Sequence, residues 1–122
     1  MPPGKLNLAR AFDSFDDAFR PRIVADVNDS QVKAVKLRGS FEWHRHELED
    51  ELFLVVRGRL RVRFRDGDVE LDEGELIVVP RGVEHLPEAI GDECQVLLFE
   101  PATTLNTGTE ETARTVRDLE RL

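Results

Sequence analysis

The sequence predicts an all-β fold, either a sandwich or a closed barrel of short strands. Between residues 22 and 99, apolar residues recur in about six to eight short runs, and glycine, proline, asparagine or aspartate separates them about every eight to twelve residues. Two of these runs also flank Asp66-Gly67, a strong signal for a tight hairpin turn. Evenly spaced short strands of this kind are typical of β-sandwiches and barrels.

The length and composition indicate an ordinary globular chain. We expect one domain over residues 1–122, with a barrel core over about 22–100 on which an N-terminal segment (1–21) and a C-terminal tail (101–122) pack. The net charge of -8 gives no reason to expect binding to nucleic acid or to an anionic membrane. Because no run approaches the roughly 20 apolar residues of a membrane span and the start lacks a hydrophobic signal core, we expect a cytoplasmic location. The single cysteine, Cys94, excludes an internal disulfide.

The first part of the chain predicts a short helical segment and then two strands. A roughly helical spacing of apolar side chains predicts one or two helical turns within residues 4–20, with a capping start at Ser14. Residues 22–27 and 31–37 are predicted strands, separated by the turn residues 28–30.

The next two segments are predicted strands of different character. In residues 41–46, alternation puts Glu42, His44 and His46 on one face and Phe41, Trp43 and Arg45 on the other. Residues 51–57 are apolar on both faces, so we expect both faces to be covered, the outer one by the N-terminal segment or by a second subunit. On the outer face, Trp43 would join the apolar side chains of Leu52, Leu54 and Val56. Such a face predicts a homodimer.

The hairpin over residues 59–72 has a charged face and an apolar face. A two-residue turn at Asp66-Gly67 predicts three ion pairs on the charged face, namely Arg65 with Asp68, Arg63 with Glu70 and Arg61 with Asp72. We interpret these arginines as a solvated face. Further strands are predicted over 76–80, 83–86 and 94–99, a loop over 103–109, and either a short amphipathic helix or a loose tail over 109–122.

All three histidines fall where they can meet a carboxylate. Two of them, His44 and His46, share a strand face, and a carboxylate five residues further on can return to that face after a turn. With His85 from a second turn, the set of three imidazoles and one carboxylate suits a divalent transition metal such as Fe, Mn, Ni, Zn or Cu. The alternative is that these are ordinary polar residues near the surface.

These residues fall in two motifs that resemble those of the cupin superfamily, in particular its small single-domain members. The first motif runs from Gly39 through the histidine pair to Glu51 and Gly58, with one residue fewer than usual before His44. The second motif has the usual spacing of Gly74, Pro80, Gly82 and His85, but Ala89 stands where an asparagine is usual. The resemblance extends over about residues 32–99.

The resemblance implies a double-stranded β-helix, or jelly-roll barrel, with a metal near one mouth. It implies the ligands His44, His46, Glu51 and His85, with Asp50 and Glu49 as rivals for the carboxylate position. Glu42, on the histidine face, is the candidate catalytic residue, either as a general base or as a partner of a ligand; the alternative is a carboxylate in water at the rim.

Two classes of function fit this resemblance. The first is a metal-dependent enzyme that acts on a small polar molecule bound in the barrel, either as a dioxygenase or as an isomerase of the mannose-6-phosphate isomerase type. Such an isomerase would need a basic phosphate clamp, for which only Arg57 and Arg81 are candidates. The second class is a non-catalytic sensor or small-molecule binder in which the metal is structural or helps to recognise the ligand.

Overall fold

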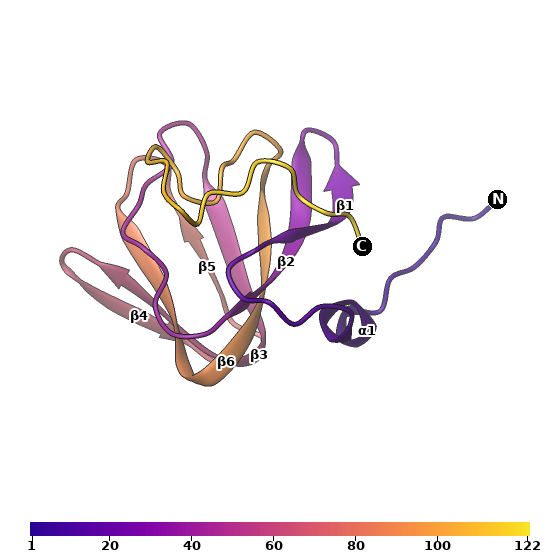
Figure 1. The fold of residues 1–122 in the computed structure, drawn as a ribbon, viewed down its shortest axis with the longest axis horizontal. Coiled ribbons are helices and arrows are strands. Elements are labelled where there is room, and N and C mark those ends of the chain that lie inside the picture. Colours follow the sequence, from indigo (N-terminus) through magenta and orange to yellow (C-terminus); the bar gives the residue numbers. More distant parts are fainter.

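Two long bent strands organise the fold (Figure 1). The computed structural model describes residues 1–122 and contains one short helix and six strands in a single antiparallel sheet of order β1-β2-β6-β3-β4, with β5 also paired to β3. The elements are α1 (Leu8–Asp13), β1 (Arg22–Val27), β2 (Ser30–Leu37), β3 (Glu51–Phe64), β4 (Gly67–Leu71), β5 (Leu76–Val79) and β6 (His85–Pro101).

The sheet folds over on itself because β3 and β6 both bend. The first half of β3 pairs with the second half of β6, from Leu52 opposite Phe99 onward, and the second half of β3 pairs with the first half of β6 as far as Phe64 opposite His85. The register slips near Gly58, where the two halves of β3 meet. These two strands therefore run through both sides of the barrel, and their two ends come to one mouth (Figure 1).

The core lies between the two sides of this folded sheet. In the first half of β3, Phe53 and Val55 point inward and are buried, whereas Leu52, Leu54 and Val56 are only half-buried on the outer face. This alternation confirms the predicted faces of residues 51–57. The main apolar cluster contains eleven buried residues: Val35, Leu37, Phe53, Val55, Leu60, Val62, Leu71, Val79, Cys94, Val96 and Leu98.

The N-terminal segment covers part of the outer face. Phe12 and Phe15 pack with Ala34 of β2, and Val56 and Leu97 lie against this second cluster. The helix begins earlier than predicted, because the Asn7 side chain accepts a hydrogen bond from the Arg10 N–H and so caps α1. The prediction that Ser14 starts a helix is wrong: Ser14 ends α1.

A second prediction of secondary structure is also wrong. Residues 41–46 form no regular strand and pair only through an isolated bridge between His44 and His85. Of the two alternatives for residues 109–122, the helix does not form: the chain crosses the mouth of the barrel (Figure 1) and ends on β1, where the Leu122 N–H donates to Ile23 O and the Ile23 N–H to Glu120 O.

The third error concerns the hairpin register. Arg63 lies opposite Asp68 and Arg61 opposite Glu70, so the two-residue loop is Arg65-Asp66 and the register differs by two residues from the prediction. A shift by two keeps every side chain on its face, so alternation alone does not distinguish the registers. Residues outside the hairpin also supply partners: Arg61 contacts Glu88 of β6, with N and O 2.9 Å apart, and Arg65 contacts Glu84, just before β6, at 3.2 Å.

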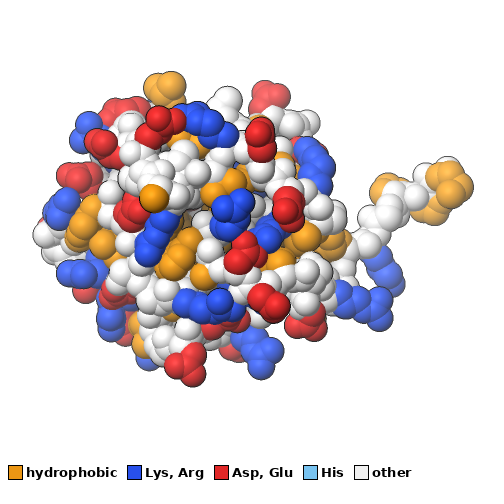
Figure 2. Space-filling model, in the orientation of Figure 1, with side chains coloured by type: hydrophobic (Ala, Val, Ile, Leu, Met, Phe, Trp, Pro, Cys, Tyr) orange, Lys and Arg blue, Asp and Glu red, His pale blue; other side chains and the backbone are white.

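The surface carries mixed charge on the face seen in Figure 2, where acidic and basic side chains alternate without a patch of one sign. The structure contains no helix with the length and hydrophobicity needed to cross a bilayer.

The bend at Gly58 gives a test of the fold. Its φ is +87°, and a Cβ placed there would lie 2.7 Å from Glu93 O, whereas Gly91 has φ +83° with nothing near its Cβ position. Both Gly→Ala variants incur the cost of a left-handed backbone, about 1–3 kcal/mol, but only Gly58→Ala adds a clash with backbone atoms. Chemical denaturation should show a clearly larger loss of unfolding free energy for Gly58→Ala; equal losses would contradict this account of the bend.

Candidate metal centre

Four buried side chains meet at one mouth of the barrel. One ligand atom from each of His44, His46, Glu51 and His85 lies within 4.8 Å of the others, and each residue is at most 5% exposed. The structure thus brings together all four residues of the predicted ligand set.

The bend of the sheet makes this meeting possible. Glu51 is the first residue of β3, and His85 pairs with Phe64 at the other end of the same 14-residue strand. A straight strand of that length would hold these two positions about 40 Å apart. In the folded sheet, Glu51 Oε1 lies 3.3 Å from His85 Nε2 and 3.3 Å from His46 Nε2.

Two further contacts anchor the irregular segment that carries the histidine pair. His44 and His85 exchange backbone hydrogen bonds, with the His44 N–H 3.0 Å from His85 O and the His85 N–H 2.9 Å from His44 O. The Gly82 N–H donates to His46 O at 2.7 Å. The segment therefore lies against the turn before β6, and its imidazole rings pack with centroids 4.3–5.6 Å apart.

Backbone carbonyls orient two of the imidazole rings. His44 Nδ1 lies 2.8 Å from Glu42 O, and His85 Nδ1 lies 2.9 Å from Val83 O. A carbonyl oxygen only accepts, so Nδ1 carries a proton in each ring, and Nε2 is the nitrogen that faces the cluster. Both ring nitrogens of His46 are buried without a hydrogen-bond partner. Unpartnered buried nitrogens are rare in folded proteins, and a metal ion would satisfy one of them.

The electrostatics also fit a cation. Burial, helped by His85 nearby, lowers the pKa of His44 to about 4, so this imidazole is neutral and able to bind a metal at neutral pH. Burial alone would raise the pKa of the Glu51 carboxyl, but the neighbouring side chains of Glu100, His46 and His85 hold that pKa well below its usual range. The cluster therefore offers a charged carboxylate beside three imidazoles, a donor set that suits a divalent transition metal.

A buried pair supports the Glu51 carboxylate from behind. Burial and the charge of Glu51 raise the pKa of Glu100 well above its usual range, so Glu100 is protonated. Lys33 Nζ donates to Glu100 Oε1 at 2.8 Å, and both of these side chains are 2% exposed. The sequence did not identify this pair, because the alternation in residues 31–37 leaves open whether Lys33 faces inward.

The rival carboxylates lie outside the cluster. Asp50 Oδ1 accepts from the Arg81 N–H at 2.9 Å, and Glu49 accepts from the Thr103 hydroxyl at 2.9 Å. Glu42 contributes its backbone carbonyl to His44, but its carboxylate accepts from the Thr112 hydroxyl at 3.1 Å and lies 4.0 Å from Arg114 Nε. The catalytic role of Glu42 stays a prediction.

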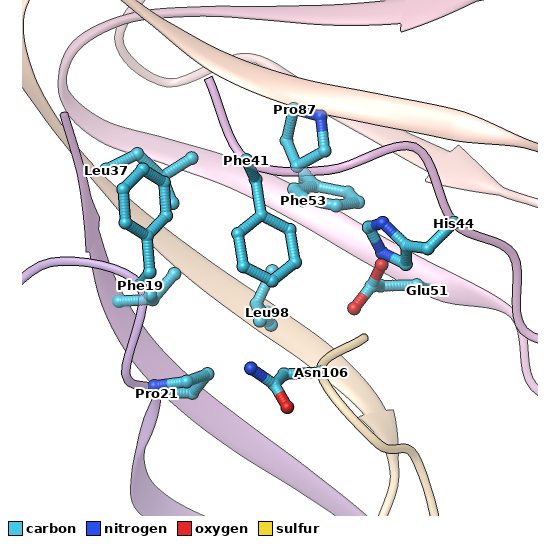
Figure 3. A pocket seen from close by; sticks show the side chains of 11 residues that line it. Phe19, Pro21, Leu37, Phe41, His44, Glu51, Phe53, Pro87, Leu98 and Asn106 are labelled. Atoms are coloured by element: carbon cyan, nitrogen blue, oxygen red, sulfur yellow. The ribbon is translucent and has the colours of Figure 1, made fainter. Parts of the chain in front are cut away.

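A small apolar cavity of about 40 Å³ borders His44 and Glu51 (Figure 3). Aromatic and aliphatic side chains form most of its wall, and Asn106 is the polar residue of the wall outside the ligand cluster. Neither Arg57 nor Arg81 borders the cavity, and both are exposed.

The fold and this site define a small β-barrel with a candidate metal centre at its mouth. Residues 33–100 match the family model described as the cupin domain, which covers more than half of the chain. The chain belongs to the cupin family, and the predicted family, the all-β class and the antiparallel barrel are confirmed.

Solved cupin-like structures resemble the chain closely. A cupin-2 domain containing protein from Shewanella frigidimarina is 43% identical, with a TM-score of 0.77, over 79% of this chain and 93% of that one. Protein NMB1881 from Neisseria meningitidis is 31% identical, with a TM-score of 0.73, over 81% of this chain and 100% of that one. KdgF from Halomonas sp. is also 31% identical, with a TM-score of 0.60, over 66% of this chain and 76% of that one.

A curated relative is also similar over part of its length. The uncharacterized protein YdbB from Bacillus subtilis is 33% identical over 63 residues, which are 51% of this chain and 56% of YdbB. The match therefore spans little more than half of that relative.

The position of Glu51 within the cluster predicts an unequal effect of two neutral substitutions. Glu51→Gln removes the carboxylate charge between His46 and His85, so it should weaken Zn(II) binding by more than the roughly 10- to 100-fold that the loss of an outer partner costs. Asp50→Asn should leave the affinity within about threefold, because Asp50 bonds to the Arg81 amide. Competition titration against a chromophoric zinc chelator measures both; the reverse ranking would reassign the ligand.

Proposed function

We propose that the chain is a metal-dependent enzyme that acts on a small organic molecule bound in the barrel beside the metal. The observation that carries this proposal is the buried His44, His46, Glu51 and His85 cluster, which opens onto a cavity. A divalent transition metal with three imidazole ligands and one carboxylate ligand keeps free coordination positions, and supplies a Lewis acid or, if redox-active, a centre for oxygen chemistry.

The chain's own residues prepare this site in three ways. The carbonyls of Glu42 and Val83 orient the rings of His44 and His85, so Nε2 of each ring faces the cluster before a metal arrives. The neighbouring side chains of Glu100, His46 and His85 hold the pKa of the Glu51 carboxyl well below its usual range, so the carboxylate is charged. Apolar side chains around His44 and Glu51 keep water away from the position of the substrate.

Of the two reaction classes, a dioxygenase fits the cavity better than an isomerase of a phosphorylated sugar. A buried phosphate needs cationic partners, and neither Arg57 nor Arg81 borders the cavity. Glu42 would serve as the general base only after its carboxylate leaves Thr112 and Arg114.

One observation favours a second candidate, a non-catalytic binder or sensor with a structural or ligand-recognition metal. Outside the ligand cluster, the cavity wall offers Asn106 as its polar residue, and an amide is no acid or base at neutral pH.

Metal loading followed by an activity panel tests the proposal. Elemental analysis of untagged protein should find one transition metal ion per chain. At a metal concentration of 100 Kd, loading should raise the free energy of unfolding by about 2.7 kcal/mol and the Tm with it. The Fe(II)-loaded chain should then consume oxygen with one member of a panel of enols, thiols and diketones, whereas Glu51→Gln should not. Metal uptake without oxygen consumption would favour the binder, and no uptake would contradict both readings.

We also propose that the chain forms a homodimer through the outer face of the sheet. Half-buried Leu52 and Leu54 of β3 lie beside Val78 and Leu76 of β5, and Leu52 is also opposite Phe99 of β6. The β5 and β6 members of this patch are well exposed, at 57% for Leu76, 50% for Val78 and 38% for Phe99. A contiguous apolar patch of this kind marks an interaction surface, and such a patch can pair with its copy about a two-fold axis.

Light scattering at increasing protein concentration tests the dimer. The wild-type chain should have the mass of two chains, and Leu76→Lys/Val78→Lys should shift it to one chain, because each face would bring like charges together. Val69→Lys, an exposed change on β4, is the matched control. A wild-type monomer at high concentration would contradict the dimer.

A further inference from the structure

The cavity beside the ligand cluster is unusual in being walled almost entirely by hydrocarbon. Besides His44, Glu51 and Asn106, its wall consists of apolar side chains from six separate parts of the chain: Phe19, Pro21, Val35, Leu37, Phe41, Phe53, Pro87 and Leu98. Figure 3 shows the Phe41 and Phe53 rings and Leu98 close to His44 and Glu51.

We infer that the molecule that reaches the metal has an apolar, ring-sized body and one small polar head, and that its ring lies against Phe41. This inference rests on the proposed function and names the ligand class of the same site. It replaces the small polar molecule that the sequence suggested.

A row of aromatic rings leads to the metal ligands. The Phe41 ring meets the His44 ring edge to face, with centroids 5.4 Å apart and planes at 88°. On its other side the Phe41 ring stacks with that of Phe19, with centroids also 5.4 Å apart and planes at 24°. A planar apolar ligand stacked on Phe41 would thus be next to a metal ligand, where its polar head reaches the metal.

The ring of Phe19 holds the position that such a ligand would take. The backbone of Phe19 has φ +66°, a left-handed conformation that costs a residue with a Cβ of order 1–3 kcal/mol. This conformation is fixed by the Phe19 N–H, which donates to Lys36 O at 2.8 Å. Residues held in such conformations cluster at functional sites.

The size of the cavity indicates which ring moves. A space of about 40 Å³ is too small for a six-membered ring. Phe19 is only half-buried and lies between α1 and β1, outside regular secondary structure, whereas Phe53 is buried within β3. Displacement of the Phe19 side chain is therefore the easier way to open space on Phe41.

An arginine from the C-terminal segment marks the mouth above the stack. The Arg114 guanidinium lies 4.5 Å from the Phe19 ring centroid and 5.7 Å from that of Phe41. Its Nη1 donates to Ser40 O at 3.1 Å, and the side chain remains 42% exposed. A cation in this place favours a π-system beneath it, whether the ring belongs to Phe19 or to the ligand.

The same wall disfavours sugars and phosphorylated ligands. Each hydroxyl or phosphate oxygen buried against hydrocarbon needs a partner, and only Asn106 is available outside the cluster. The buried Lys33 ammonium is already bonded to Glu100, and it lines a separate polar cavity that does not include His44 or Glu51.

Two probes with the same metal-binding head test the inference. On the Zn(II)-loaded chain, calorimetry should show that benzohydroxamate binds at least tenfold more tightly than acetohydroxamate, because only the former carries a ring. Phe41→Ser should reduce this ratio to about twofold by lowering the affinity for benzohydroxamate alone. Phe41→Leu, a milder change, should give an intermediate ratio, and Val69→Ser on exposed β4 should leave it unchanged.

The outcomes distinguish a failure of the inferred ligand class from a failure of the proposed metal-dependent function. A wild-type ratio below about twofold, or displacement of benzohydroxamate by mannose 6-phosphate at lower concentration, would overturn the inference and leave the metal centre intact. A chain that takes up no metal would contradict the proposed function. In that case NMR of the metal-free chain with toluene decides the inference: perturbation of Phe41 and Phe19 signals supports an aromatic site, and their absence overturns it.

Discussion

The Glu51 carboxylate is a buried negative charge, and the rest of the site is arranged around it. Charge of this kind is costly inside a protein unless cations or hydrogen-bond donors surround it. Here His46 and His85 lie 3.3 Å from the carboxylate, and Glu100, which is paired with Lys33, also neighbours it. A divalent ion among the imidazoles would complete this compensation, so one constraint explains both the ligand cluster and the buried pair behind it.

The barrel provides this arrangement through the bend of two strands. Glu51 and His85 lie at opposite ends of the ladder between β3 and β6 and meet because the sheet folds over near Gly58. The irregular segment with His44 and His46 closes the mouth by hydrogen bonds to His85 and Gly82. The strands β3 and β6 thus supply Glu51 and His85, and the irregular segment supplies His44 and His46. Because this segment is not a regular strand, both of its imidazole rings can turn toward the same point.

The sequence predicted the family, the barrel and the four residues that meet at its mouth because these depend on local signals. Spacing within two motifs identified His44, His46, Glu51 and His85, and alternation in residues 51–57 identified the inner face of β3. The errors arose where contacts between distant residues decide the structure: the hairpin arginines also pair with Glu84 and with Glu88 of β6, and residues 41–46 bridge to His85 instead of forming a strand. The roles of Lys33 and Phe19 depend on contacts between separate parts of the chain, which no local pattern contains.

The central claim is that Nε2 of three histidines and the carboxylate of Glu51 form one metal-binding centre. The most direct measurement is long-range ¹H–¹⁵N NMR of the three imidazole rings, recorded before and after addition of one equivalent of Zn(II). The account predicts Nδ1-protonated rings for His44 and His85 in the metal-free chain, and metal-shifted Nε2 signals for all three histidines on addition of zinc. Coordination through Nδ1 of His44 or His85, or unchanged signals from any of the three rings, would contradict it.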